Sequence, residues 1–146
     1  MPQVEVIKPI RQHVTAKLRV CAYARVSTDS ADQLNSFASQ VQYYTNYIES
    51  RADWELVDIY ADRGITGTDA HKRDEFLRMM EDCRKRKIDQ ILVKSLSRFA
   101  RNTADCIAAI RELRQLGVTV IFEKERINTR LMASEMLISM MSAFAQ

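Results

Sequence analysis

Cysteine, histidine and glycine are scarce in this chain, and each shortage argues against a class of site. Its three cysteines, Cys21, Cys83 and Cys106, are widely spaced and odd in number. They predict core positions rather than a disulfide framework or a zinc cluster. The two histidines, His13 and His71, lack a spacing that suggests a hydrolase triad. With three glycines there is no Walker-type phosphate loop, and no cysteine stands six residues before an arginine as in cysteine phosphatases.

Long apolar runs are also missing, so no segment reaches the length of a membrane span, and no signal-peptide pattern opens the chain. We therefore expect an intracellular protein without a membrane partner. At 47% hydrophobic residues, a chain of 146 residues can form one domain with a proper core.

The net charge of +3 is small, but the basic residues are unevenly distributed. Between residues 84 and 101 a single acid, Asp89, stands among Arg84, Lys85, Arg86, Lys87, Lys94, Arg98 and Arg101. Such a stretch predicts a polyanionic partner. A solvated helix end would also account for its first part, residues 84–87.

Apolar periodicity predicts strands and helices in alternation. We expect strands at residues 18–27, 54–60, 88–94 and 118–122, and helices at 37–48, 73–86 and 103–116. Asn102 or Thr103 can cap the last of these helices, and Gly117 can end it. Residues 62–71 predict a flexible turn, and residues 1–17 an irregular extension. The alternation predicts an α/β fold in three layers, with a mostly parallel central sheet flanked by helices.

The last segment, residues 129–146, has a different pattern. Its apolar residues, which include four of the seven methionines, point around the whole helical circumference. A helix that is apolar on all sides must be buried on all sides, so we expect a second chain to cover it. The chain ends inside this pattern, and we expect the natural polypeptide to continue.

The stretch 23–28, Tyr-Ala-Arg-Val-Ser-Thr, closes the first apolar run. In an extended strand Arg25 and Ser27 lie on one face, where the guanidinium favours the alkoxide-like state of the hydroxyl. In parallel sheets, ligands bind beyond the carboxyl ends of the strands. Three segments reach that edge: residues 25–27, the turn before Arg73, and residues 94–101. They suit a serine that attacks a phosphodiester while arginines stabilise the developing charge; a strand ending in surface residues is the alternative.

These motifs, in this order, resemble the serine recombinases, and most of all the large serine integrases and transposases. The first matching motif is Tyr23-Ala-Arg-Val-Ser-Thr28, which is similar to the nucleophile motif of the family. Residues 62–67 and 72–79 resemble its mobile loop and the following helix. Residues 93–103 resemble its arginine-rich active-site loop. Residues 142–146 resemble the early part of its long oligomerisation helix. The resemblance implies a resolvase-like catalytic domain at 18–128 and the start of that helix at 129–146, with DNA-binding domains C-terminal to this chain.

The resemblance also implies the site residues. Ser27 would be the nucleophile, and the scissile phosphate would be bound by Arg25, Arg73, Arg98 and Arg101. Gln40 matches a glutamine of the active site, although a helix-surface amide is the alternative; Asp62 matches an acid of the mobile loop. Ser97 stands where many resolvases have an aspartate, which leaves the general acid/base open. Lys94 is a candidate DNA contact or a solvated strand end, and Arg73 could also be a surface residue.

The function implied is site-specific recombination of a mobile element, such as integration, excision or transposition. DNA is cleaved through a 5′-phosphoserine, strands are exchanged in a tetramer, and the ends are rejoined without cofactor or metal. The implied partners are double-stranded DNA and further copies of the chain, as a dimer and then a tetramer. The implied location is the bacterial cytoplasm. Two alternatives stay open: a non-catalytic α/β regulatory or anion-binding module, and a phosphoesterase or nuclease without strand exchange.

Overall fold

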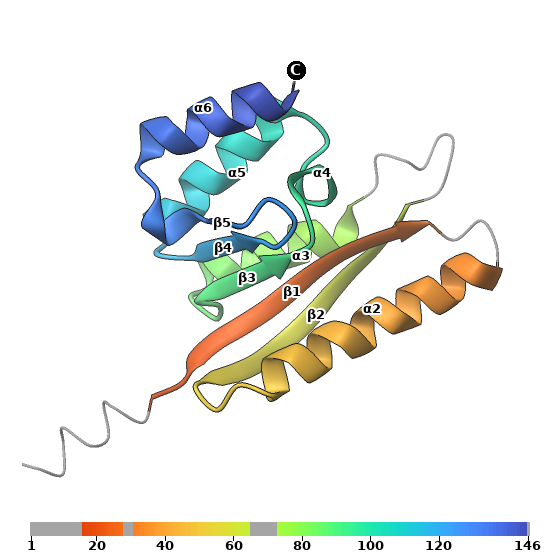
Figure 1. Ribbon diagram of the computed structural model, residues 1–146. Coiled ribbons are helices and arrows are strands. Elements are labelled where there is room, and N and C mark those ends of the chain that lie inside the picture. Colours follow the sequence, from red (N-terminus) through yellow and green to blue (C-terminus); the bar gives the residue numbers. More distant parts are fainter. Residues whose placement is uncertain (1–15, 28–30, 65–72, 146) are drawn as a thin grey trace, which may run out of the picture.

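A computed structural model (Figure 1) describes residues 16–27, 31–64 and 73–145. Most of the predicted extension, the glycine turn, both histidines and Thr28 lie outside these residues. The backbone of Ser27 is described as the last residue of a strand, but its side chain is not.

A five-stranded sheet forms the centre of the fold, with strand order β2-β1-β3-β4-β5. The strands are β1 (Leu18–Ser27), β2 (Trp54–Gly64), β3 (Gln90–Val93), β4 (Thr119–Phe122) and β5 (Ile127–Asn128). The first four strands are parallel, and β5 runs antiparallel to β4. The predicted α/β fold with a mostly parallel sheet is therefore confirmed. The two-residue strand β5 was not predicted, because so short a strand carries no periodicity.

Helices cover both faces of this sheet, in the three layers that the sequence predicts (Figure 1). They are α2 (Ala31–Glu49), α3 (Asp74–Arg84), α4 (Leu96–Phe99), α5 (Thr103–Gln115) and α6 (Ser134–Ala145), with a short 3-10 turn at Thr129–Leu131. Helix α2 packs on one face through Tyr44 and Ile48, whereas residues of α3, α4, α5 and α6 join the larger core on the other.

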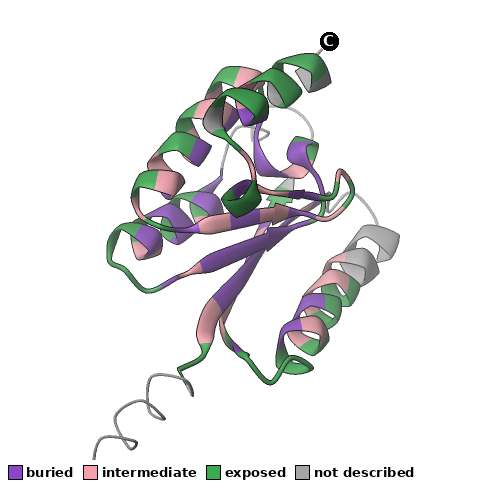
Figure 2. Ribbon diagram, turned by 60° about the vertical axis from the view of Figure 1, so that its left-hand side comes forward, coloured by how far each residue is buried: buried purple, intermediate pink, exposed green. Residues whose placement is uncertain are grey.

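Strand β1 is apolar without alternation because both of its faces are buried. Val20 and Ala22 belong to the core under α2, whereas Cys21 and Tyr23 belong to the larger core on the opposite face. Figure 2 shows the central strands in the colour of buried residues. A strand enclosed by helices on both faces has this composition.

All three cysteines are buried and carry free thiols, as their places on apolar stripes predict. Cys21 lies on β1, and burial raises the pKa of its thiol well above the usual value. The pKa of Cys83 on α3 is raised to about 12 and that of Cys106 on α5 to about 11, in both cases mainly by burial.

Several elements differ from the prediction. The helix predicted at 37–48 begins earlier, since α2 starts at Ala31. The segment that resembles an active-site loop contains a short helix, α4, at residues 96–99. The helix predicted at 129–146 is divided into the 3-10 turn and α6, which begins at Ser134. The turn predicted from residue 62 begins later, since β2 extends to Gly64. In each case contacts between distant segments lengthen or divide the helix or strand that the local composition predicts.

The ends of α5 follow the sequence signals. The side chain of Asn102 accepts a hydrogen bond from the backbone N–H of Asp105 at 2.9 Å, which caps the first turn. Beyond the last turn, Gly117 has φ of +77°, a conformation in which a residue with a Cβ would be strained.

Helix α4 is short, and aromatic packing fixes it to the core. Phe99 is fully buried and lies edge-on to Phe76 of α3, with ring centroids 5.3 Å apart, and to Phe122 of β4 at 5.4 Å. Such edge-to-face pairs stabilise a core beyond the area they bury. The ring of Phe99 therefore positions the two residues before it, Ser97 and Arg98.

Replacing Phe99 should expose this dependence. Phe99→Ala leaves a cavity among three elements and should lower the free energy of unfolding by about 3–5 kcal/mol, whereas Phe99→Leu should cost about 1 kcal/mol. Urea denaturation followed by circular dichroism measures both values. A loss below about 1 kcal/mol for the alanine variant would mean that α4 is held by other contacts.

Candidate active site

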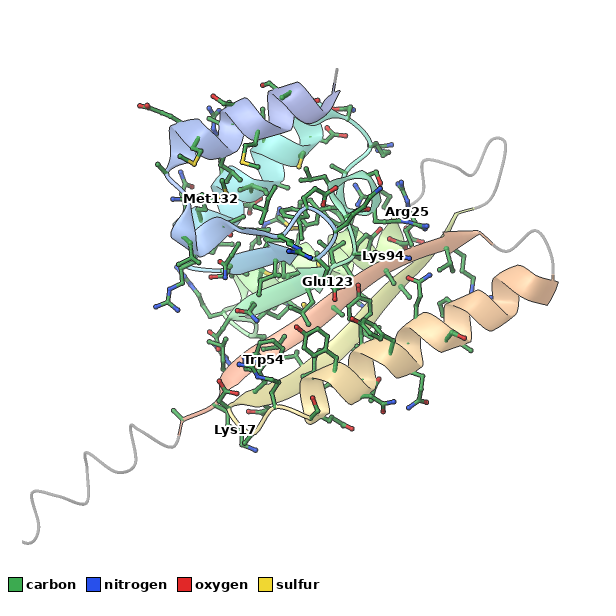
Figure 3. All side chains as sticks on the ribbon, viewed as in Figure 1. Lys17, Arg25, Trp54, Lys94, Glu123 and Met132 are labelled. Carbon is green, nitrogen blue, oxygen red and sulfur yellow. The ribbon has the colours of Figure 1, made fainter. Side chains whose placement is uncertain are left out.

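Polar residues gather at the carboxyl edge of the sheet, just beyond the buried part of β1. Arg25 lies there half-buried (Figure 3), and Ser27 ends the strand two residues later in register with Gly64 of β2. The turn of helix α4 lies over the same edge, because the chain continues from the end of β3 directly into it. The fold thus brings together segments that are far apart in the chain, since Arg25 and Arg98 are separated by 73 residues.

The end of β1 and helix α4 are tied by reciprocal hydrogen bonds. Nη2 of Arg25 donates to the backbone oxygen of Ser97 at 2.8 Å, and Nη1 of Arg98 donates to the backbone oxygen of Arg25. Each guanidinium has donors in addition to the one used here. Two arginines predicted from the sequence are therefore brought together by the structure.

Arg73 is the residue before α3, and its guanidinium lies in the same region. It is 8% exposed, and its guanidinium lies 3.8 Å from the ring centroid of Phe76. Its Nη2 donates to the backbone oxygen of Phe99 and contacts the Tyr23 hydroxyl at 3.4 Å. Its Nε is buried and has no hydrogen-bond partner among the described residues. The surface position considered for Arg73 is thus wrong.

Neutral carbonyl oxygens, rather than carboxylates, hold these three arginines. Among the residues that the structure describes, none of the three forms an ion pair. Burial, and then the positive charges of Arg73 and Arg98, lower the pKa of Arg25. Like charges held together in this way favour the binding of an anion between them.

Among the described residues, Asp62 is the carboxylate buried at this edge, and its partners belong to the fold itself. It is 6% exposed and lies on β2, where its oxygens accept the backbone N–H groups of Glu75 at 2.9 Å and Phe76 at 3.1 Å. It also accepts the Tyr23 hydroxyl at 2.7 Å, and burial raises the pKa of that tyrosine. Asp62 therefore caps the first turn of α3 from a neighbouring strand.

This arrangement corrects the sequence-based placement of Asp62 in a mobile loop. Arg73, at the N-cap position of α3, makes no side-chain capping bond of its own. The sequence did contain a sign that another residue caps α3. The helix begins at Arg-Asp-Glu without Ser, Thr or Asn before it, so its first N–H groups need acceptors from another part of the chain. By holding α3, Asp62 also sets the position of Arg73.

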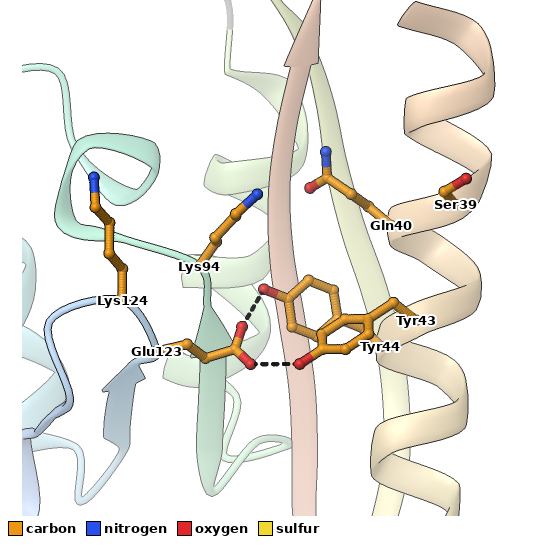
Figure 4. A pocket seen from close by; sticks show the side chains of 7 residues that line it. All are labelled: Ser39, Gln40, Tyr43, Tyr44, Lys94, Glu123 and Lys124. Carbon is orange, nitrogen blue, oxygen red and sulfur yellow. Dashed lines mark hydrogen bonds between the residues drawn. The ribbon is translucent and has the colours of Figure 1, made fainter. Parts of the chain in front are cut away.

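The remaining predicted residues lie around this cluster. Ser97 is exposed, and its hydroxyl is 3.0 Å from that of buried Ser95. Arg101 is exposed and lies 3.7 Å from the carboxylate of Asp105, and both residues line a groove between α3 and α5 that Arg73 also lines. Gln40 and Lys94 line a groove between α2 and the ends of β3 and β4 (Figure 4).

Five residues of that groove were not among the predicted site residues: Ser39, Tyr43, Tyr44, Glu123 and Lys124. Both tyrosine hydroxyls donate to the Glu123 carboxylate, at 2.9 and 2.6 Å. The partners are about 80 residues apart in the chain, so no local pattern could have indicated the contact.

The basic stretch of residues 84–101 is divided between the two edges of the sheet. Its first part, residues 84–87, lies where α3 ends and the chain turns toward β3. Arg84 pairs there with Glu112, and Arg86 donates to the backbone oxygen of Leu116 at 2.9 Å. Only residues 94–101 lie at the carboxyl edge, so the helix-end interpretation fits the first part.

The described residues contain no group of three or more His, Cys, Asp or Glu side chains that could hold a metal ion. In the same part of the chain, no helix is both long and apolar enough to cross a membrane.

A family model and the curated relatives of this chain point to the same family. Residues 20–146 match the family model described as "Resolvase, N terminal domain". A resolvase/recombinase of Pseudomonas putida is 31% identical over 129 residues, which cover 88% of this chain and 64% of that protein. A transposon Tn3 resolvase of Escherichia coli has the same identity, with 63% of its length covered. The chain thus spans just under two thirds of these curated relatives.

Solved structures agree with this match. A resolvase family site-specific recombinase from Streptococcus pneumoniae superimposes with a TM-score of 0.71 at 34% identity, covering 88% of this chain and 86% of that one. The N-terminal catalytic domain of TP901-1 integrase gives a TM-score of 0.62 at 23% identity, covering 86% and 92%. At that identity the second match supports the fold alone.

The capping role of Asp62 can be tested by measuring the free energy of unfolding of a variant. Asp62→Ala removes two backbone acceptors of α3 and leaves the buried Tyr23 hydroxyl without its acceptor, so the free energy of unfolding should fall by about 2–4 kcal/mol. Chemical denaturation gives the value. Glu55→Ala, an exposed acid on the same strand, is the control and should leave the midpoint unchanged. Equal midpoints for both variants would contradict the capping role.

Proposed function

This chain belongs to the resolvase family of serine recombinases, and from that membership we propose that it contains the catalytic machinery of a site-specific DNA recombinase with Ser27 as the nucleophile. The observation that carries the proposal is the convergence of Arg25, Arg73 and Arg98 behind the last residue of β1. A serine at that strand end lies at the edge where the three guanidinium groups gather.

The proposed reaction is a transesterification. The Oγ of Ser27 attacks the phosphorus of a DNA phosphodiester, forming the Oγ–P bond, and the bond to the 3′ oxygen breaks. The serine proton ends on the 3′ oxygen, which leaves a 3′ hydroxyl and a 5′ phosphate esterified to the serine. After strand exchange, a 3′ hydroxyl attacks the phosphoserine and restores both groups. Because each step replaces one phosphoester with another, no external energy source is required.

The arginines would supply the electrostatic part of catalysis. Negative charge grows on the phosphate oxygens as the nucleophile enters, and preorganised donors aimed at those oxygens lower the barrier. Arg25 and Arg98 hold each other in place through backbone oxygens, so their remaining donors need little reorganisation. The buried, unpartnered Nε of Arg73 is a further donor. Arg101 and Gln40 are assigned to the rim of this site.

Further copies of the chain would complete the assembly. Helix α6 buries Leu137, but Met136 is 56% exposed and Met140 39% exposed. We assign this apolar face to contact between copies, in a dimer and then in a recombining tetramer. Selective reading of DNA sequence is assigned to other parts of the polypeptide, so this chain alone should bind DNA weakly and with little sequence preference.

The nucleophile can be tested by covalent capture. The full reading frame is incubated with a plasmid carrying the DNA ends of its own element, and a denaturing gel detects protein joined to DNA. Wild type should give both an adduct and a recombinant product, and Ser27→Ala should give neither, because the variant lacks the hydroxyl that attacks the phosphate.

Ser50→Ala is the matched control, since Ser50 is exposed at the end of α2 and its hydroxyl donates to the backbone oxygen of Tyr47. It should behave as wild type. Recombinant product from Ser27→Ala would identify a different nucleophile. Cut plasmid without recombinant product from wild type would favour the nuclease alternative.

The arginine roles can be tested by conservative changes. Arg98→Lys keeps the charge but loses the planar fork, so cleavage should slow on the order of 100-fold. The affinity for DNA, measured by fluorescence anisotropy, should change far less. Arg111→Lys, at an exposed position of α5, is the control. Equal rates for the two variants would remove Arg98 from the catalytic set.

A further inference from the structure

The groove beside the arginine cluster has a volume of about 490 Å³ and is built from two walls (Figure 4). Helix α2 supplies Gln40, Tyr43 and Tyr44, and the ends of β3 and β4 supply Lys94, Glu123 and Lys124. Lys94 stands three residues before Ser97, whose backbone oxygen accepts the hydrogen bond from Arg25. The groove therefore adjoins the proposed catalytic edge.

Glu123 directly precedes Lys124, but its carboxylate is hydrogen-bonded to the two tyrosines of the opposite wall. One oxygen accepts the Tyr43 hydroxyl at 2.9 Å and the other accepts the Tyr44 hydroxyl at 2.6 Å. Burial and these hydrogen bonds raise the pKa of both tyrosines, so both are protonated donors at neutral pH. Two neutral donors from the opposite wall thus occupy the carboxylate of Glu123.

The lysines are consequently left with their charge exposed. Both side chains are exposed, and neither forms an ion pair with a described carboxylate. Their backbones are joined, since the N–H of Lys124 donates to the oxygen of Lys94 at 2.8 Å. In Figure 4 both side chains extend toward the end of the sheet to which β1 points. Two ammonium groups on one rim form a site for an anion.

We propose that Lys94 and Lys124 bind a backbone phosphate of duplex DNA that flanks the scissile phosphate, with the tyrosine–Glu123 bonds keeping the carboxylate away from the lysines. This inference rests on the proposed function, because it is the DNA held at the arginine cluster that passes this rim. The contact orients the duplex and reads no sequence, as phosphate contacts do.

The salt dependence of DNA binding tests the lysines. Affinity of the chain for a random-sequence duplex is measured by anisotropy at several salt concentrations. Because both lysines contact one phosphate, Lys94→Gln combined with Lys124→Gln should reduce the slope of log K against log salt by about 1, and each single variant by less. The control is Lys85→Gln with Lys87→Gln, which removes the same charge at the opposite edge of the sheet. A double variant no different from this control overturns the proposal.

A double substitution of the two tyrosines tests the role of Glu123 without changing the charge of the protein. Tyr43→Phe with Tyr44→Phe keeps both rings but releases the Glu123 carboxylate, which can then pair with a lysine. DNA affinity should fall with an unchanged far-ultraviolet spectrum, and adding Glu123→Gln should restore it. Wild-type affinity in the tyrosine double variant would overturn the role given to Glu123.

The covalent-capture experiment separates this inference from the proposed function. An adduct from wild type together with an unchanged slope in the lysine variants overturns only the phosphate site. A reduced slope without any adduct supports the phosphate site as a DNA contact and leaves the nucleophile assignment as the failed part.

Discussion

Mutual repulsion among three guanidinium groups is the constraint on which the site depends. Arg25, Arg73 and Arg98 are each held by a backbone oxygen, and those oxygens belong to Ser97, Phe99 and Arg25 itself. A carboxylate in their place would hold an arginine more strongly but would cancel its charge. Carbonyl oxygens hold the side chains in position and leave their positive potential available for the phosphate of the proposed reaction.

The carbonyl arrangement requires a rigid backbone, and the surrounding core provides it. The rings of Phe76, Phe99 and Phe122 connect α3, α4 and β4 beneath the cluster. On the β2 side, Asp62 links β2 to the first turn of α3 and to Tyr23 of β1. Residues outside the arginine cluster therefore determine where the arginines lie.

The sequence predicts those features that arise from local pattern. Doubly buried strands such as β1 need continuous apolar residues, and Asn102 and Gly117 mark the ends of α5, so the layers and the parallel sheet could be predicted. Asp62 was misplaced because a neighbouring Gly64 resembles a turn signal, whereas the sheet extends through it. The bonds of Tyr43 and Tyr44 to Glu123 join segments about 80 residues apart, and only the tertiary fold brings them together.

The burial of every thiol has a practical consequence. Cys21, Cys83 and Cys106 all lie in the core with raised pKa values, and the thiolate is the reactive form of cysteine. Maleimide dyes should therefore leave the folded protein unlabelled. One cysteine introduced on the outer surface of α6 could carry a fluorophore at a single known position, with the native cysteines left in place. The chain is thus ready for single-molecule tests of the proposed contact between its copies.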